Sequence, residues 1–172
     1  MDASATHSLL LVKVRPANLD DAQAILEIYN RAVLESTATF DLIPRELDEQ
    51  RAYIAERSGG LAVLVADDDG VVAGFASLSF YRSRPAYRTS VENSVYVHQD
   101  YQRRGVGDAL IDALIEWATA HGFHAMFARI ADAQEASMRL HAKHGFELVG
   151  IEKEVGRKFG QWRDAAIMQR LL

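Results

Sequence analysis

The chain has 172 residues, a formal net charge of −5, 49% hydrophobic residues, 25% charged residues and no cysteine. This composition is typical of an ordinary globular protein, and the lack of cysteine excludes disulfides, thiolate metal ligands and a cysteine nucleophile. The negative charge gives no electrostatic reason to expect nucleic acid or an anionic membrane as a partner.

The length indicates one domain over residues 1–172, with a loose N-terminal tail over about 1–8. No internal repeat and no linker rich in Pro, Gly or Ser divides the chain. The apolar run over 9–12 is too short for a membrane span or for the core of a signal peptide. We therefore expect a soluble, cytoplasmic protein, which also fits the lack of cysteine.

The first half of the chain predicts two helices and three strands. Apolar residues recur at helical spacing after Asp20, and the acids Asp20 and Asp21 favour a helix start at this point. Two runs rich in β-formers flank Asp69 and Gly70, a pair common in hairpin turns. We expect a strand over 9–15, a helix from 20 to about 33, a loop over 35–44, a helix over 47–57 and a hairpin over 61–80.

The second half alternates strands and helices. A stripe of Val106, Leu110, Leu114 and Trp117 indicates a buried helix face, and Gly122 is placed to end that helix. This order favours a mixed α/β sheet with helices on both faces. We expect a loop over 81–89, a strand over 90–98, a helix from about 106, a strand over 124–130, a helix over 134–144 closed by a glycine, and strands over 146–155 and 163–172.

The stretch YQRRGVGDAL (101–110) has two glycines at the start of the helix that is expected from about residue 106. It is not a P-loop, because no lysine and hydroxyl follow the second glycine, and it is not a dinucleotide motif, because the third glycine is missing. Small residues before a helix still expose backbone N–H groups to an anion. Arg103 and Arg104 add positive charge beside them. The alternative is a tight turn with solvated arginines.

Positive charge gathers around this stretch. Between Tyr81 and Arg104, five arginines stand against two acids, a local excess of three positive charges in a chain of net charge −5. Such a reversal of charge is expected where a protein holds anionic ligands, although solvated loop arginines are also common.

The motif QRRGVG (102–107) follows a strand, and AS..LH..HGF (136–146) comes after it along the chain. This combination resembles the GNAT superfamily of N-acetyltransferases, in which such a turn holds the pyrophosphate of acetyl-CoA. Within the superfamily, the chain is similar to the phosphinothricin and methionine sulfoximine acetyltransferases. The stretches that carry this similarity are STATF (36–40), RSRPAYRTSVENSVYV (82–97), QRRGVG, ASMRLHAKHGF (136–146) and GRKFGQWRDAAIMQ (156–169).

The resemblance implies a GNAT-type fold, a mixed and mostly antiparallel central sheet of about seven strands with helices on both faces. It also implies acetyl-CoA as co-substrate, and we expect no metal. Because the chain has no cysteine to carry an acyl group, direct attack within a ternary complex is the expected route. Ser137 resembles a family contact to CoA, whereas Gln134 stands where the family often has asparagine, which shifts any contact there. The residues implied to bind acetyl-CoA are Val95, Tyr96, Val97, Arg103, Arg104, Gly105, Val106, Gly107, Asp108, Gln134 and Ser137.

Glu92 and His141 are the candidates for proton transfer. The carboxylate at the position of Glu92 looks catalytic in the family, as the base for the amine; the alternative is a carboxylate that only pairs with Arg82 or Arg88. Burial would raise its pKa and a neighbouring arginine would lower it. His141 stands where many superfamily members have a tyrosine that protonates the leaving thiolate; the alternative is a histidine bonded within the fold. We reject a metal pair with His144, because no third ligand is near in the sequence.

The arginine-rich loop and the STATF stretch form the implied acceptor site. Its three loop arginines are more than a neutral acceptor needs and favour a small dianionic or zwitterionic amino acid; the alternative is a solvated loop at a dimer edge. The family forms homodimers, and GRKFGQW (156–162) is expected to line this pocket or that of a partner, unless Lys158 and Trp162 are ordinary surface or packing residues. The residues implied to bind the acceptor are Phe40, Arg82, Arg84, Pro85, Ala86, Tyr87 and Arg88.

The leading hypothesis is an acetyl-CoA-dependent N-acetyltransferase for the α-amine of a small amino acid or a glutamate-like analogue of the phosphinothricin or methionine sulfoximine type. One alternative is an acetyltransferase for a protein N-terminus, a polyamine or another amine. A polyamine would want acidic walls, and the arginine-rich loop argues against these. The other alternative is a domain that binds acetyl-CoA without catalysis.

Overall fold

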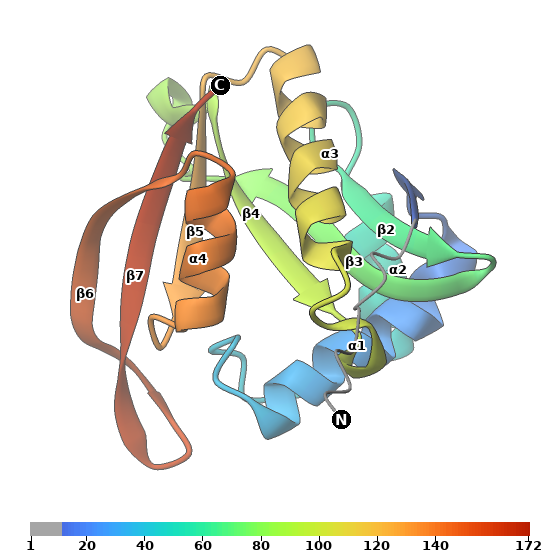
Figure 1. Cartoon of the computed structure of the whole chain (residues 1–172), viewed down its shortest axis with the longest axis horizontal. Helices are drawn as coiled ribbons and strands as arrows, with labels where there is room; N and C mark the ends of the chain where they lie inside the picture. Colours follow the sequence, from blue (N-terminus) through green and yellow to red (C-terminus); the bar gives the residue numbers. More distant parts are fainter. Residues whose placement is uncertain (1–11) are drawn as a thin grey trace, which may run out of the picture.

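The structure is a computed structural model that describes residues 12–172, and a seven-stranded sheet with α-helices packed on it forms its frame (Figure 1). The predicted tail over about 1–8 and residues 9–11 of the predicted first strand lie outside the described residues. The strands are β1 (Lys13–Pro16), β2 (Val63–Asp68), β3 (Val71–Phe80), β4 (Ser90–Val97), β5 (Ala125–Ala131), β6 (Glu147–Lys158) and β7 (Gln161–Leu171). The helices are α1 (Ala22–Glu35), α2 (Leu47–Ala55), α3 (Val106–Ala120) and α4 (Glu135–Lys143), with short 3₁₀ turns at Leu19–Asp21, Pro85–Tyr87 and Gln99–Tyr101.

The strands follow the order β1-β2-β3-β4-β5-β7-β6 across the sheet. Neighbours run antiparallel except β4 and β5, which are parallel. The chain crosses from β4 to β5 through α3, as a parallel pair requires a long connection. The predicted mixed, mostly antiparallel sheet of the GNAT type is therefore confirmed.

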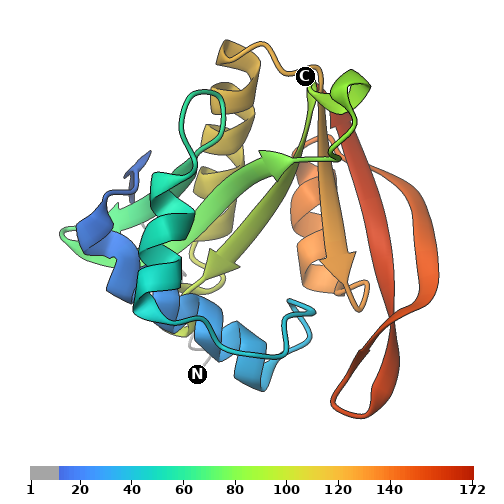
Figure 2. The same ribbon diagram turned by 180° about the vertical axis from the view of Figure 1, so that it is seen from behind.

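β4 and β5 pair along only part of their length. Their register runs from Ser90 opposite Ala125 to Asn93 opposite Ala128, although both strands continue. Beyond these pairs the strands diverge (Figure 2). Residues 94–97 of β4 keep their pairing with β3 on one edge, but within residues 12–172 no strand pairs with their other edge. The divergence therefore leaves backbone donors and acceptors exposed in the middle of a sheet.

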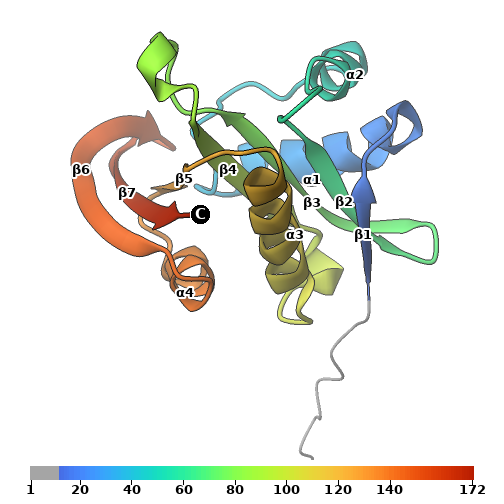
Figure 3. The ribbon, with the colours of Figure 1, turned by 90° about the horizontal axis from the view of Figure 1, so that it is seen from above.

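Helices cover both faces of this sheet, as the sequence predicts. α1 and α2 lie on one face, and α3 and α4 lie on the other (Figure 3). α3 buries Leu110 and Leu114 in one core cluster, and α1 buries Ile25 and Val33 in a second. Each fully buried side chain of this size contributes about 1.5–3 kcal/mol relative to an exposed one.

Two helices differ in detail from the prediction. α1 begins after the turn Leu19–Asp21, because the side chain of Asn18 accepts a hydrogen bond from the backbone of that turn. In α3, Trp117 is only half-buried, and its indole N–H donates to the carbonyl oxygen of Gly60 at 3.1 Å. Ala118 takes the predicted core position, since residues four apart share one ridge of a helix.

The C-terminal hairpin is longer than predicted. β6 and β7 meet at Phe159 and Gly160, whose φ angles of 51° and 74° are both left-handed. The GRKFGQW stretch (156–162) therefore forms the end of this hairpin. Register shifts between Leu148 and Gly150 and between Glu152 and Gly156 bend the hairpin, which curves strongly in Figure 3.

Candidate functional site

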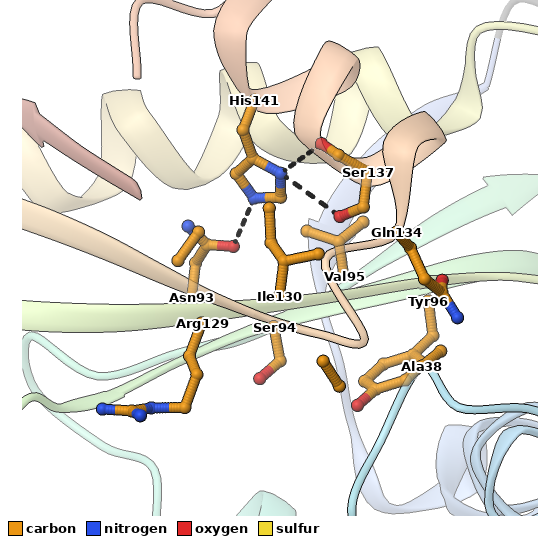
Figure 4. A pocket seen from close by; sticks show the side chains of 12 residues that line it. Ala38, Asn93, Ser94, Val95, Tyr96, Arg129, Ile130, Gln134, Ser137 and His141 are labelled. Atoms are coloured by element: carbon orange, nitrogen blue, oxygen red, sulfur yellow. Dashed lines mark hydrogen bonds between the residues drawn. The ribbon is translucent and has the colours of Figure 1, made fainter. Parts of the chain in front are cut away.

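A groove of about 1020 Å³ lies where β4 and β5 diverge. Residues 95–97 of β4, the turn before α3, one side of α4 and one side of α1 form its walls. A smaller cavity of about 110 Å³ adjoins the groove, and Val95, Tyr96, Gln134 and Ser137 line both spaces (Figure 4). The site is thus elongated, with the N-terminus of α3 at its outer end and the paired part of β4 and β5 at its inner end.

The glycine turn at the outer end has the geometry of an anion site. Gly105 is the N-cap of α3 with a φ of 86°, and no side chain caps the helix there. The first N–H groups of α3 therefore have no intrahelical partner. Arg103 lines the groove, whereas Arg104 turns back toward the carbonyl oxygen of Asp100 and the ring of Tyr101.

Asp108 lies in the first turn of α3, where its negative charge would repel an anion bound at the helix N-terminus. Its carboxylate accepts hydrogen bonds from Lys143 at 2.6 Å and from His144 at 2.9 Å. Burial raises the pKa of Asp108, but these two bonds outweigh it and hold the pKa below its ordinary value. α4 therefore neutralises the Asp108 side chain, while the residue itself lines the groove.

Glu92 lies on β4, next to the lining of the smaller cavity. The pKa of Glu92 lies above its ordinary value, because burial raises it. The positive charges of Arg129 and Arg82 lower this pKa and the negative charge of Glu152 raises it, but burial has the largest effect. The nearest cation is Arg129 of β5, whose Nε lies 3.9 Å from Oε2 of Glu92. The alternative pairing of Glu92 with Arg82 or Arg88 is therefore not the one formed, and sequence analysis missed Arg129.

His141 is buried, with 3% of its surface exposed, and lines the smaller cavity. Its Nδ1 lies 2.8 Å from the carbonyl oxygen of Ser137, and its Nε2 lies 3.0 Å from Oδ1 of Asn93 (Figure 4). The Asn93 amide donates to the carbonyl oxygen of Phe127, which turns Oδ1 toward the ring. The pKa of His141 lies below its ordinary value, because burial and, to a lesser extent, the nearby His144 lower it more than the bond to Ser137 raises it. Asn93 lies between Val91 and Val95, which belong to the core face of β4, and a polar residue at this position was the signal that sequence analysis passed over.

Gln134 is already engaged by the loop that follows α1. Its amide donates to Oγ1 of Thr37 at 3.1 Å, and the Thr37 hydroxyl donates to Asp132 at 2.9 Å. Asp132 and Ala133 have φ angles of 57° and 45°, which are strained for residues other than glycine. Thr37 thus holds the strained turn from β5 into α4 and fixes one wall of the groove.

The residues predicted to bind an acceptor lie outside the two spaces described above. Residues 82–89 are exposed, and Tyr87 packs edge-on against Tyr81 at 5.7 Å between ring centres. Tyr81 in turn stacks on Phe127 at 4.0 Å, and Phe127 is the register partner of Glu92. An aromatic path therefore connects the arginine-rich loop with Glu92, although sequence analysis named only Tyr87.

Phe40 and Lys158 join the loop after α1 to the C-terminal hairpin. A Cβ atom at Gly156 would lie 2.7 Å from the Phe40 ring, so that the ring packs directly on the hairpin backbone. Lys158 is 3% exposed, and its Nζ donates to the carbonyl oxygens of Thr39 at 2.8 Å and Asp41 at 3.1 Å. Lys158 is therefore a buried link between segments and not an ordinary surface lysine.

His144 faces Asp108 and Asp112 rather than the partners of His141. Within residues 12–172, no three or more His, Asp or Glu side chains are grouped to hold a metal ion. In the same part of the chain, none of the helices has the length and apolar character needed to cross a membrane.

Comparisons with known proteins agree on one family. Residues 23–146 match the model of the acetyltransferase (GNAT) family. The chain is 40% identical to L-amino acid N-acyltransferase MnaT of Escherichia coli, over 92% of each chain. It is 42% identical to an L-methionine sulfoximine/L-methionine sulfone acetyltransferase of Pseudomonas paraeruginosa, over 91% of this chain and 92% of that protein.

A solved structure shows the same similarity. The GNAT superfamily phosphinothricin acetyltransferase of Sinorhizobium meliloti, in complex with acetyl-CoA, superimposes with a TM-score of 0.91 at 39% identity. The match covers 94% of this chain and 88% of that one.

Proposed function

This chain belongs to the acetyltransferase (GNAT) family, and we propose that it transfers the acetyl group of acetyl-CoA to the α-amine of a small amino acid or glutamate-like analogue. It is an N-acetyltransferase, as its relatives are. The observation that carries the proposal is the divergence of β4 and β5, beside which a groove starts at an uncapped helix N-terminus and adjoins a smaller cavity lined by Asn93 and Arg129, the neighbours of Glu92.

The walls of this groove fit an extended thioester of CoA. We assign the pyrophosphate to the turn over 103–108, where backbone N–H groups of α3 and the Arg103 side chain meet. The unpaired edge of residues 95–97 offers backbone groups to the amides of pantetheine, with Ser137 on the facing wall. Backbone N–H groups of the same edge can stabilise the oxyanion that forms when the amine attacks.

Glu92 is the proposed base. An α-ammonium group has a pKa of about 8 or higher, so that it must lose a proton before it can attack at neutral pH. Glu92 takes this proton and the nitrogen attacks the thioester carbon. A C–N bond forms, the C–S bond breaks, and the nitrogen releases its second proton to solvent, which leaves a neutral amide. Burial raises the pKa of Glu92 toward that of the amine, which makes the proton transfer less uphill.

His141 is the proposed source of the proton for the leaving thiolate. Each of its ring nitrogens faces an oxygen acceptor, Asn93 on one side and Ser137 on the other. The doubly protonated ring satisfies both acceptors, whereas burial favours the neutral ring. Burial keeps the pKa of His141 below its ordinary value, so a proton on the ring is given up readily to a thiolate that leaves in the cavity.

The acceptor is proposed to enter from the side of Glu92. The arginine-rich loop supplies Arg82, Arg84 and Arg88 for acidic oxygens of the acceptor, together with Pro85, Ala86 and Tyr87. Phe40 is proposed to bound the far end of the acceptor. A relative named for methionine sulfoximine and methionine sulfone supports an acceptor that carries polar oxygens on its side chain.

We also propose that residues 1–172 form one domain that acts as a cytoplasmic homodimer, without nucleic acid or a membrane as partner. Exposed apolar side chains along β6 support the homodimer, among them Val149 at 60% and Val155 at 53% exposure. Phe159 and Trp162 at the end of the hairpin are exposed as well. Apolar clusters of this kind mark association surfaces.

A thiol-release assay with acetyl-CoA tests the proposed function. The panel contains α-amino acids, phosphinothricin, methionine sulfoximine, short peptides and polyamines, and we expect release with the amino acids and their analogues. Preference for peptides or polyamines would favour the alternative acceptors. A thermal shift with acetyl-CoA but no thiol release with any amine would instead indicate a domain that only binds.

A further inference from the structure

Arg129 stands at the point where β4 and β5 separate. It follows Ala128, which is the last residue of β5 paired with β4, and it lines the smaller cavity. Side chains alternate along a strand, so Arg129 lies on the same face as Phe127, and Phe127 is the register partner of Glu92. In Figure 4 the Arg129 side chain extends away from His141. Arg129 is therefore a cation at the inner end of the site, on the side of Glu92.

Two carboxylates flank this guanidinium. Nη1 donates to Oε2 of Glu152 on β6, whereas Nε lies 3.9 Å from Oε2 of Glu92, which is too long for a hydrogen bond. Within residues 12–172, Glu152 is the one group that accepts a hydrogen bond from the Arg129 guanidinium. A guanidinium has two edges that can each bind a carboxylate, so the edge formed by Nε and Nη2 still has its donors.

We propose that Nε and Nη2 of Arg129 bind the α-carboxylate of the acceptor while Glu92 receives its α-ammonium group. In an α-amino acid a single carbon separates these two groups, and Arg129 and Glu92 present the complementary charges side by side. The inference rests on the proposed function and narrows it. It makes an α-carboxylate, and not only an amine, a requirement for good acceptors.

The surroundings of Arg129 favour this role over the exposed loop arginines. The side chains of Arg129 and Glu92 are 34% and 30% exposed, so both charges are partly removed from water and their contacts are strengthened. Glu152 holds the guanidinium from the opposite edge, which reduces the freedom that Arg129 would lose on binding. The loop arginines then remain available for oxygens on the acceptor side chain.

Matched acceptors test the inference. L-methionine sulfone and its α-carboxamide differ only in the carboxylate, and we expect the wild-type enzyme to prefer the acid in kcat/KM. In Arg129→Gln, kcat/KM for the acid should fall by roughly 10- to 100-fold, because a charge-assisted contact is lost, and the carboxamide should change little. Arg129→Lys should keep part of the preference, since it keeps the charge but not the planar fork.

The control is Arg139→Gln, because Arg139 lies exposed on α4 and pairs with Glu135. This variant should keep the wild-type preference. Equal losses for acid and carboxamide in Arg129→Gln, or a wild-type preference in a folded Arg129→Lys, would overturn the inference, as would a wild-type enzyme that does not discriminate. If the wild-type enzyme acetylates no amino acid at all, the proposed function fails first and the inference fails with it.

Discussion

Oδ1 of Asn93 lies 3.0 Å from Nε2 of His141, and the residue before Asn93 is Glu92. Because side chains alternate along β4, these consecutive residues point to opposite faces of the sheet. Val91 and Val95 join the core cluster under α3, whereas Tyr96 packs on the cluster under α1. A thioester between β4 and β5 would thus have the carboxylate on one side and the imidazole on the other.

This arrangement predicts that His141→Asn lowers kcat at every pH. The loss should be roughly 100-fold or more if His141 protonates the thiolate, and high pH should not restore it, because the missing group is an acid. Steady-state kinetics between pH 6 and 9.5 at saturating acetyl-CoA would measure it, with that range set by the amine pKa of about 8. His124→Asn, at an exposed position, is the control. An unchanged kcat in a folded His141→Asn would leave His141 a purely structural residue.

Gly105→Val should raise the KM for acetyl-CoA more than the KM for the acceptor. A side chain at this position adds bulk where the backbone is to approach pyrophosphate, and its φ of 86° strains any residue with a Cβ. Gly122→Val is a matched control, because Gly122 closes the other end of α3 with a φ of 76°. If Gly105→Val and Gly122→Val lose similar thermal stability but only Gly105→Val raises the KM for acetyl-CoA, the effect on cofactor binding is separate from backbone strain. If the two variants have the same KM for acetyl-CoA, the turn has only a structural role.

Lys158→Met should lower the free energy of unfolding by about 1–3 kcal/mol, because the buried carbonyl oxygen of Thr39 and the partly buried one of Asp41 lose their donor. For a chain of this length, that corresponds to a lower Tm by about 2–4 °C per kcal/mol. Lys153→Met is the control, since Lys153 is 72% exposed and pairs with Asp164 at the surface. Calorimetry of both variants measures the difference, and an equal Tm for the two would contradict the role of Lys158 as a buried link.

Elements of the fold followed from local patterns in the sequence. The spacing of Leu110 and Leu114 predicted α3, and the alternation of turn residues and β-formers predicted the hairpin of β2 and β3. These patterns are local because a helix or a hairpin satisfies its backbone within a few neighbouring residues. The family motifs predicted a mixed, mostly antiparallel sheet, and the parallel pairing of β4 and β5 among antiparallel neighbours confirms it.

The contacts that complete the site had no local pattern to reveal them. Arg129 and Glu152 are 23 residues apart and lie on strands separated by β7, and Lys158 reaches Thr39 across 119 residues. Such pairs depend on the order and curvature of the strands, which hydrophobic periodicity does not encode. Sequence analysis therefore left Lys158 either in the lining of the acceptor pocket or as an ordinary surface or packing residue, and it did not consider Arg129.

The mechanism depends most on Glu92. Glu92→Gln keeps the shape and hydrogen-bonding capacity of the side chain but cannot accept a proton, so we expect kcat to fall by roughly 100- to 10,000-fold near neutral pH. Part of this loss should return at high pH, where the amine loses its proton without help. In the wild-type enzyme, activity should be lost as pH falls through the raised pKa of Glu92, because the protonated carboxyl group is no base. The pH profile of kcat for both enzymes is the measurement.

The stability of the variant shows whether such a loss is catalytic. Burial raises the pKa of Glu92, so the folded protein holds this proton more tightly than the unfolded chain does. Ionisation of Glu92 therefore lowers stability as pH rises from the ordinary carboxyl pKa to the raised one, and Glu92→Gln removes that penalty. A Tm at pH 8 no lower than that of the wild type, together with a low kcat, would assign the defect to proton transfer. Glu116→Gln, at an exposed position of α3, should change neither quantity.

If Glu92 only anchors the ammonium group, the acceptor KM rises and alkaline pH rescues little, and an undiminished kcat would remove Glu92 from the mechanism.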